Sequence, residues 1–293
     1  MTTPITLPVS PRLRLLGLLA LISGTLLWGT SFVVVQGAIA DVPPSLVTLV
    51  RFGIAALCFL PFLKRDRRLI SVGLELGLWI MGGYTTQAIG LIYTTVNRSA
   101  FITSLYVLGI PILFWLLGRS VGRVFWIGAG LALLGVGLLS YDGTPPNLGD
   151  LWTLGAALSY TLYIWRLEVH TPSFNALTLT AAQLWGTTAI ALLWVFLGQA
   201  EYLMPSSWPT LPWPALVYLG IFTTAFTTVL QTWGQRFVGA SQASIVYTLE
   251  PVWASIFAFV VINERLGIQG ILGAAAILLA TLLCQLAGQS DRP

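Results

Sequence analysis

Ten apolar runs, each close to the length of a membrane-spanning helix, decide what this chain can fold into. A helix needs about 20 mostly apolar residues to cross the hydrocarbon core of a bilayer, which is about 30 Å thick. Polar residues, prolines and glycines separate the runs, which cover approximately residues 13–39, 45–63, 70–91, 98–117, 124–141, 151–167, 174–198, 213–235, 241–262 and 268–287. The sequence therefore predicts an all-α integral membrane protein with ten transmembrane helices.

The scarcity of charge excludes the soluble classes of protein. Of the 293 residues, 56% are hydrophobic and only 8% are charged, whereas about a quarter of the residues of a soluble domain are charged. A soluble enzyme is therefore excluded. The excess of cations gives a net charge of +4, but a nucleic-acid-binding protein gathers its cations on one face of a soluble fold. Here they lie in short connectors, so we expect a lipid bilayer and no nucleic acid as partner.

The connector cations predict the orientation of the chain. With the N-terminus in the cytoplasm, eleven Lys and Arg residues fall on the cytoplasmic side, and only Arg98 and Arg265 fall outside. Cytoplasmic loops carry the excess of Lys and Arg in membrane proteins. We therefore expect a multi-pass protein of the cell inner (plasma) membrane with both termini in the cytoplasm. The eleven residues are Arg12, Arg14, Lys64, Arg65, Arg67, Arg68, Arg119, Arg123, Arg166, Arg236 and Arg292.

A connector rich in glycine and proline, residues 141–150, divides the chain into two halves of five predicted spans, 13–141 and 151–287. A shift of 144 residues places Gln87 on Gln231, and the order of spans and connectors recurs. Because each half has an odd number of spans, the second half is inserted upside down relative to the first. Inverted repeats of this kind are the architecture of many secondary transporters, whose sites lie near the bilayer midplane.

Four short motifs resemble one family. They are Trp28-Gly29-Thr30-Ser31-Phe32, Arg51-Phe52, Glu250-Pro251 and Asn263-Glu264-Arg265. In this order and spacing they resemble the EamA type of the drug/metabolite transporter superfamily, over about residues 15–287. The resemblance implies two EamA-like five-helix repeats, and its exporter branch implies transport of amino acids, aromatic ones included. The chain departs from the family's symmetry where Tyr106 and Gly109-Ile110-Pro111 occupy the first-half counterpart of Glu250-Pro251.

Two glutamines are the leading candidates for substrate contact. Gln87 and Gln231 occupy equivalent positions in the two halves, and threonines flank each of them. An amide offers two donors and one acceptor, so it can bind an ammonium or a carboxylate. The alternative is a structural role, because intramembrane glutamine commonly hydrogen-bonds a neighbouring helix.

Aromatic residues inside the spans are the second group of candidates. Several share a helix with a candidate glutamine, as Tyr84 does with Gln87 and Trp233 with Gln231. Apolar walls with a few polar anchors are how small-molecule sites are built, which favours amphipathic solutes such as aromatic or large apolar amino acids. Packing alone is the alternative for most of these rings. The candidates are Trp28, Tyr84, Tyr106, Tyr160, Tyr163, Trp185, Trp233 and Tyr247.

Two charged residues inside the spans are candidates for gating or coupling, because ionisable groups at membrane depth mark functional sites by default. Glu250 has three possible roles: it pairs with Arg51 or another cation, it binds a substrate ammonium, or it carries a coupled proton. The family resemblance favours a structural or gating role for Glu250 beside Pro251, which would bend a helix. Arg51 either pairs with an acid or backbone carbonyls, or binds a substrate carboxylate.

Enzymatic and ATP-driven functions find no support in the sequence. His170 is the single histidine, and the two cysteines, Cys58 and Cys284, fall in separate predicted spans, so we expect no metal site and no cofactor. We expect a secondary transporter that exports small organic metabolites, most of all amino acids, by alternating access, as a monomer or a homodimer. The alternatives are a carrier of other metabolites or drugs in the same fold, a channel, or an intramembrane enzyme.

Overall fold

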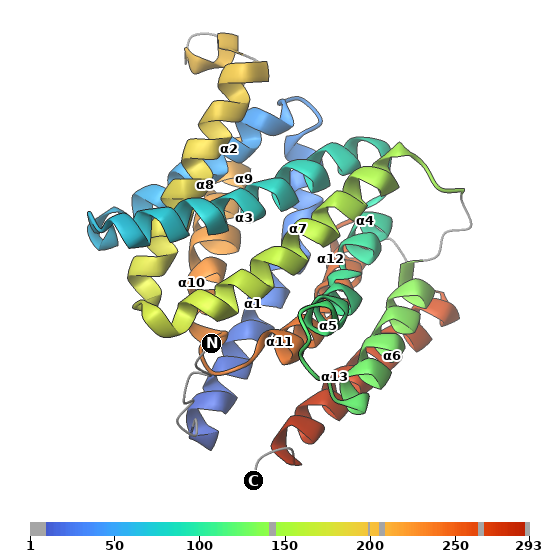
Figure 1. The fold of residues 1–293 in the computed structure, drawn as a ribbon. Helices are drawn as coiled ribbons and strands as arrows, with labels where there is room; N and C mark the ends of the chain where they lie inside the picture. Colours follow the sequence, from blue (N-terminus) through green and yellow to red (C-terminus); the bar gives the residue numbers. More distant parts are fainter. Residues whose placement is uncertain (1–9, 141–144, 199, 205–208, 263–266, 291–293) are drawn as a thin grey trace.

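The computed structural model describes residues 10–140, 145–198, 200–204, 209–262 and 267–290. All regular secondary structure in these ranges is helical, which confirms the predicted fold class (Figure 1). The α-helices are α1 (Pro11–Ala38), α2 (Pro44–Cys58), α3 (Arg67–Tyr93), α4 (Val96–Thr103), α5 (Tyr106–Leu116), α6 (Arg123–Ser140), α7 (Leu148–His170), α8 (Ala176–Gly198), α9 (Trp213–Gly220), α10 (Thr227–Gly234), α11 (Ala240–Tyr247), α12 (Glu250–Ile262) and α13 (Ile268–Ser290). Short 3₁₀ turns cover Leu60–Phe62, Thr171–Ser173 and Ala200–Leu203, and a π-helix covers Ile221–Phe226.

Seven of the ten predicted spans form single helices, α1, α2, α3, α6, α7, α8 and α13. By length and apolarity alone, four helical stretches of the described chain are able to cross a membrane: Pro11–Ala38, Ala176–Gly198, Trp213–Gly234 and Ala240–Val261. The remaining spans are shorter or more polar. The predicted motif Asn263-Glu264-Arg265 and the terminal cation Arg292 lie outside the described residues.

Local sequence signals explain where several helices begin. The side chain of Ser10 accepts a hydrogen bond from the backbone of Leu13, and Pro11 occupies the first turn of α1, where a missing N–H costs nothing. Asp66 caps α3 by accepting from the backbone of Arg68. Asn147 and Asp150 form a reciprocal capping box at the start of α7. The connectors therefore contain defined start signals for the long helices.

The fourth and ninth predicted spans are each broken into two short helices at equivalent positions. α4 and α5 meet at Ser104-Leu105, and α11 and α12 meet at Thr248-Leu249, which is the same point after the shift of 144 residues. At each break the backbone tightens to hydrogen bonds three residues apart, from Leu105 to Ile102 and from Thr248 to Ile245, both 3.2 Å long.

The eighth predicted span is irregular as well, because the π-helix separates α9 from α10. π-helical turns inside α-helices are frequent at functional sites. Here the wide turn carries Thr223 and Thr224, whose side chains are buried. Three of the ten spans therefore change their helical geometry partway through the bundle.

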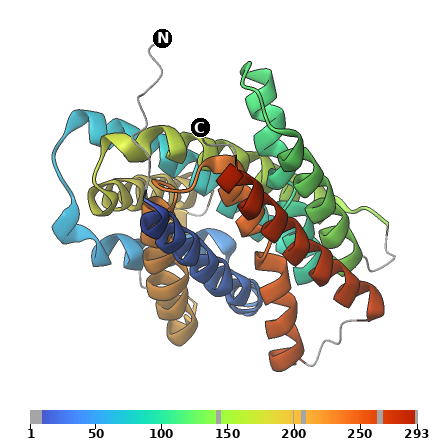
Figure 2. The same ribbon diagram turned by 90° about the horizontal axis from the view of Figure 1, so that it is seen from below.

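Close helix contacts hold the bundle together. α3 packs against both α7 and α8, and α6 packs against α13 at one edge of the molecule (Figures 1 and 2). At Gly135 of α6 an added Cβ would lie only 2.7 Å from the backbone oxygen of Gly273 in α13, so the contact requires glycine. Small residues let backbones approach in membrane proteins, where apolar burial does not drive helices together.

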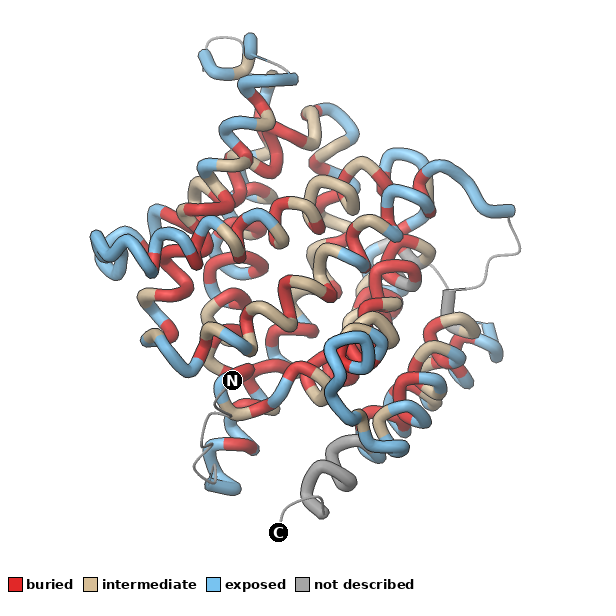
Figure 3. The backbone as a smooth tube through the Cα atoms, in the orientation of Figure 1, coloured by how far each residue is buried: buried red, intermediate tan, exposed pale blue. Residues whose placement is uncertain are grey.

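The outer surface of the bundle is apolar. Figure 3 shows buried residues where helices meet and exposed residues on the outward faces. Leu134, Leu158 and Leu197 expose 60%, 64% and 74% of their surface. Apolar area on this scale would be a liability in water, so it fits a protein surrounded by lipid.

Candidate functional site

A cavity lies at the level of the two helix breaks, between residues of both halves. The space between its walls is about 630 Å³ when the part open to the outside is included. Each of the helices α1, α2, α3, α5, α7, α10, α11 and α12 contributes at least one residue to its wall. The lining residues are Trp28, Ser31, Phe52, Ile80, Tyr84, Gln87, Tyr106, Tyr160, Tyr163, Ile164, Thr228, Gln231, Tyr247 and Glu250.

The cavity brings together nine of the thirteen residues that the sequence suggested: Trp28, Tyr84, Gln87, Tyr106, Tyr160, Tyr163, Gln231, Tyr247 and Glu250. Four others lie away from its wall. Arg51 borders a smaller neighbouring pocket, and Pro251 is buried beside Glu250. Trp185 lines a groove at the contact of α3 and α8. Trp233 packs edge-on against Phe237, with ring centroids 5.1 Å apart.

Three pairs of lining residues are related by the shift of 144 residues. Gln87 corresponds to Gln231, Tyr84 to Thr228, and Tyr106 to Glu250. The first pair consists of two residues of the same type, whereas the second and third pairs combine a tyrosine with a different residue. The walls of the cavity are therefore built from equivalent positions of two repeats that have diverged in the groups they present.

The two glutamines come from different repeats, Gln87 from α3 and Gln231 from α10. The amide nitrogen of Gln87 donates to the hydroxyl of Thr103 at the end of α4, with an N···O distance of 3.1 Å. Gln231 is buried in α10. The hydrogen bond from Gln87 joins α3 to the broken span, so this residue links helices and also borders the cavity.

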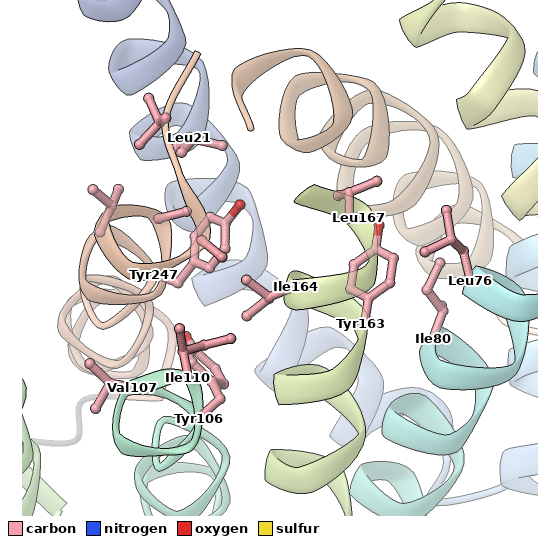
Figure 4. Close-up of a cluster of buried hydrophobic side chains, with 14 of the residues drawn as sticks. Leu21, Leu76, Ile80, Tyr106, Val107, Ile110, Tyr163, Ile164, Leu167 and Tyr247 are labelled. Atoms are coloured by element: carbon pink, nitrogen blue, oxygen red, sulfur yellow. The ribbon is translucent and has the colours of Figure 1, made fainter. Parts of the chain in front are cut away.

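Aromatic rings form two connected groups around the cavity. Tyr84 meets Phe52 and Tyr160 edge-on, with centroid distances of 4.9 and 5.9 Å. Tyr247 meets Trp28 and Tyr106 in the same manner, at 5.4 and 6.4 Å. Figure 4 shows Tyr106 and Tyr247 close to each other, with Ile164 between them and Tyr163. Edge-to-face contacts fix the orientation of these rings in the cavity wall.

Among the described residues that line the cavity, Glu250 is the one that carries a formal charge. It is the first residue of α12, and Pro251 follows it in the first turn. A carboxylate at the N-terminus of a helix is stabilised by the helix dipole and by backbone N–H groups that lack partners in the helix. In the described part of the chain, no hydrogen bond or ion pair to the Glu250 side chain is found.

Arg51 is bonded to the π-helix and not to Glu250. It is only 3% exposed. Its Nη2 donates to the hydroxyl and the carbonyl oxygen of Thr223, at 2.9 and 3.2 Å, and its Nε donates to the hydroxyl of Thr224. The guanidinium lies 4.7 Å from the centroid of the Tyr84 ring. Pairing with hydroxyls and a backbone carbonyl therefore satisfies most of its donors.

Further lining residues were not singled out from the sequence: Ser31, Phe52, Ile80, Ile164 and Thr228. Helical spacing could have found two of them. Ile80 precedes Tyr84 by one turn in α3, and Ile164 follows Tyr160 by one turn in α7, so each shares a helix face with a candidate tyrosine. Ser31 and Phe52 belong to motifs quoted for the family resemblance.

α7 holds each broken span by an acidic residue, one near each of its ends. Near its start, Asp150 accepts a hydrogen bond from Arg98 of α4, with an N···O distance of 2.7 Å. Near its other end, Glu168 accepts from the backbone N–H of Ala240, the first residue of α11, at 3.0 Å. The acid groups thus fix the first halves of both broken spans to the same helix.

Polar residues cluster beyond the apolar part of α7. Arg166 forms an ion pair with Glu75 of α3, and the Nε2 of His170 lies 3.1 Å from the same carboxylate. Burial lowers the pKa of His170, and the Glu75 carboxylate opposes this effect. Burial raises the pKa of Glu168, against the hydrogen bond from Ala240 and the charge of Arg119. No group of three or more potential metal ligands occurs within the described residues.

The chain is similar to a transporter family over nearly its whole length. The model of the EamA-like transporter family matches residues 15–141 and, a second time, residues 147–285. An uncharacterized transporter of Archaeoglobus fulgidus is 33% identical over 279 residues, which are 93% of this chain and 87% of that protein.

Two further relatives have a substrate in their names. A biotin transporter of Salmonella typhimurium is 26% identical, covering 89% of this chain and 90% of that protein. A biotin transporter of Escherichia coli is 29% identical over 77% of this chain and 78% of its own length. A solved crystal structure with 19% identity superposes with a TM-score of 0.75 and covers 94% of this chain and 99% of its own, so the fold is shared.

Proposed function

The chain belongs to the EamA-like transporter family, and from this premise we propose that it exports small organic metabolites across the inner membrane by alternating access. Aromatic or large apolar amino acids are the proposed substrates. The family describes membrane transporters, which also supports the expectation that the chain acts without catalysis. The excess of connector cations on one side supports cytoplasmic termini.

The cavity supports this proposal best. It lies between the two repeats and is lined by related positions, Gln87 with Gln231 and Tyr106 with Glu250. Sites of inverted-repeat transporters lie at the repeat interface, where broken helices supply backbone and side-chain contacts. The aromatic rings and the two amides of the wall match a solute with an apolar body and a few polar groups.

A transport assay on proteoliposomes tests the proposal. Purified protein is reconstituted, and counterflow of labelled phenylalanine and leucine is measured in the wild type and in Gln87→Ala and Gln231→Ala. Loss of an amide that bonds a charged substrate group should weaken apparent affinity about tenfold. The matched control is Gln269→Ala, because Gln269 is exposed on α13 and is not part of the cavity wall. Equal transport in all three variants would remove the two glutamines from the site.

A second candidate substrate is a carboxylate with an apolar chain, because two relatives are named biotin transporters. Biotin carries a carboxylate and no amino group, so it differs from an amino acid in the charge that it brings to the cavity. Counterflow of labelled biotin in the same vesicles separates the two candidates.

A C-terminal reporter that is active only in the cytoplasm tests the proposed orientation, and light scattering of the purified protein distinguishes a monomer from a homodimer.

A further inference from the structure

The charge of the cavity wall constrains the solute more narrowly than the family does. Over the described residues, the wall contains one acidic residue, Glu250, and no basic residue. A solute that carries only a carboxylate would therefore bring a second negative charge into a small space at membrane depth. Like charges at close range disfavour each other strongly where water is scarce.

The neighbouring cation lies outside the cavity wall and is bonded to the chain itself. Arg51 donates to Thr223 and to Thr224, and its exposed fraction is 3%. The Tyr84 ring, which does line the cavity, lies against the guanidinium. Arg51 borders the neighbouring pocket and not the cavity wall, and its Nε and Nη2 are already bonded to oxygens of the π-helix.

Unlike Arg51, the Glu250 side chain has no bonded partner among the described residues. In the described part of the chain it has no ion-pair partner and no hydrogen-bond donor, although it begins a helix that favours its charged form. An unpaired ionisable group inside a membrane protein is costly. A cation that enters the cavity would offset this cost.

The surrounding rings favour the same kind of solute. Tyr247 contacts both Trp28 and Tyr106 edge-on, and all three rings line the cavity together with Glu250. Rings attract an ammonium group over their faces, more strongly when the cation is desolvated. Acid and rings together match a primary ammonium attached to an apolar or aromatic body.

We propose that Glu250 binds the amino group of the transported solute, and that no cationic side chain binds its carboxylate. This inference rests on the proposed transport function and specifies its substrate class: apolar and aromatic amines, including amino-acid amides and esters, as well as amino acids. In an amino acid the carboxylate then meets only amides and hydroxyls. Monocarboxylates without an amino group are excluded from the cavity.

Binding to the purified full-length chain tests the proposal with ligands that share one ring. Thermal stabilisation is measured with phenylalanine amide, phenylalanine, 3-phenylpropionate and the uncharged 3-phenylpropanol, because a ligand of the folded state raises the apparent melting temperature. We expect the amide to bind at least about tenfold more tightly than the propionate, as a charge-assisted hydrogen bond predicts. Tighter binding of the propionate, or of biotin, would overturn the proposal.

The variant Glu250→Gln tests the residue. It should lower affinity for phenylalanine amide about tenfold to a hundredfold and leave affinity for 3-phenylpropanol unchanged, which shows that the variant is folded. Glu201→Gln is the matched control, because Glu201 is exposed in a connector. An unchanged preference for the amide over the propionate in Glu250→Gln would refute the assignment.

Counterflow of phenylalanine amide at equal pH on both sides separates binding from proton coupling. A residue that only carries a proton would leave this exchange intact when replaced by glutamine, and that result would also refute the assignment. If Glu250-dependent binding is found but no solute is transported, the proposed transport function fails and the ligand assignment stands. If solute is transported equally well without the Glu250 carboxylate, the ligand assignment fails and the transport function stands.

Discussion

The fourth and ninth spans break at equivalent positions but carry different side chains next to the break. Each is broken after its first eight residues, and the break falls at equivalent positions, Ser104-Leu105 and Thr248-Leu249. The residue that begins the second helix lines the cavity in both, yet it is Tyr106 in α5 and Glu250 in α12. The comparison teaches that the repeats retain the geometry of the break and differ in the charge placed there.

This difference has a physical reason. Two carboxylates sharing one small cavity would not both stay ionised, because one charge raises the proton affinity of the other. A single acid gives the cavity at most one negative charge, and the ring on the opposite half adds an apolar surface. Divergence of the repeats therefore gives a nearly symmetric scaffold an asymmetric cavity wall.

The largest effect is expected when the asymmetry is removed. Tyr106→Glu would place a second carboxylate in the cavity, and an added charge at membrane depth costs on the order of 2.5–3.5 kcal/mol. We expect a clear fall in melting temperature and loss of counterflow. Tyr106→Phe is the control, since it keeps the ring and adds no charge. Full stability and transport in Tyr106→Glu would mean that the cavity tolerates symmetric acids, contrary to the comparison.

A second test breaks the attachment of one span only. Asp150→Ala removes the bond to Arg98 of α4 and one side of the capping box of α7, at side chains that are only 11–12% exposed. The loss should cost on the order of 2 kcal/mol, read as a lower melting temperature. Asp41→Ala, in an exposed connector, should leave the melting temperature unchanged. A similar shift in both variants would show that the Arg98 contact adds nothing.

The attachment of the other span is expected to respond to pH. Because burial raises the pKa of Glu168 above its ordinary value of 4.5, the folded state binds its proton more tightly than the unfolded state. Its contribution to stability is therefore present below about pH 4.5 and is lost as pH rises through the folded pKa. Relative to wild type, Glu168→Gln should gain stability as pH increases from 4.5. A difference in melting temperature that stays constant across this range would contradict the assigned shift.

The smallest effects are expected at two tryptophans that the sequence suggested and the cavity does not include. Trp185 lies on α8, which contributes no residue to the cavity wall, and Trp233 of α10 packs against Phe237. Trp185→Phe and Trp233→Phe should change apparent substrate affinity by less than about twofold, as substitutions away from a site usually do. A tenfold loss in either variant would extend the binding site beyond the cavity described above.

The sequence predicts the scaffold well, because its signals are long and repeated. Apolar runs of about 20 residues locate the spans, and the shift of 144 residues pairs Gln87 with Gln231, which both border the cavity. Glu250 and Arg51 stand out because charges are rare inside spans. These features depend on position along the chain, so a pattern can reveal them.

The details of the site depend on features that no pattern carries. The breaks after Thr103 and Tyr247 interrupt continuous apolar runs, so hydropathy does not mark them. Helices that are apolar on every side do not reveal which face turns inward, and for this reason Trp185 could not be told from Tyr163. The partners of Arg51 come from a π-helix, and the sequence gives no sign of its wide turn.

Each break also divides its span into two short helices that are held in different ways. α4 and α11 are bonded at their first turns to the ends of α7, through Arg98 and Ala240. α5 and α12 start from the cavity with Tyr106 and Glu250. The two residues of each break separate a helix that is bonded to α7 from a helix that begins at the cavity. In each repeat the cavity wall therefore includes the junction between an attached helix and the helix that follows it.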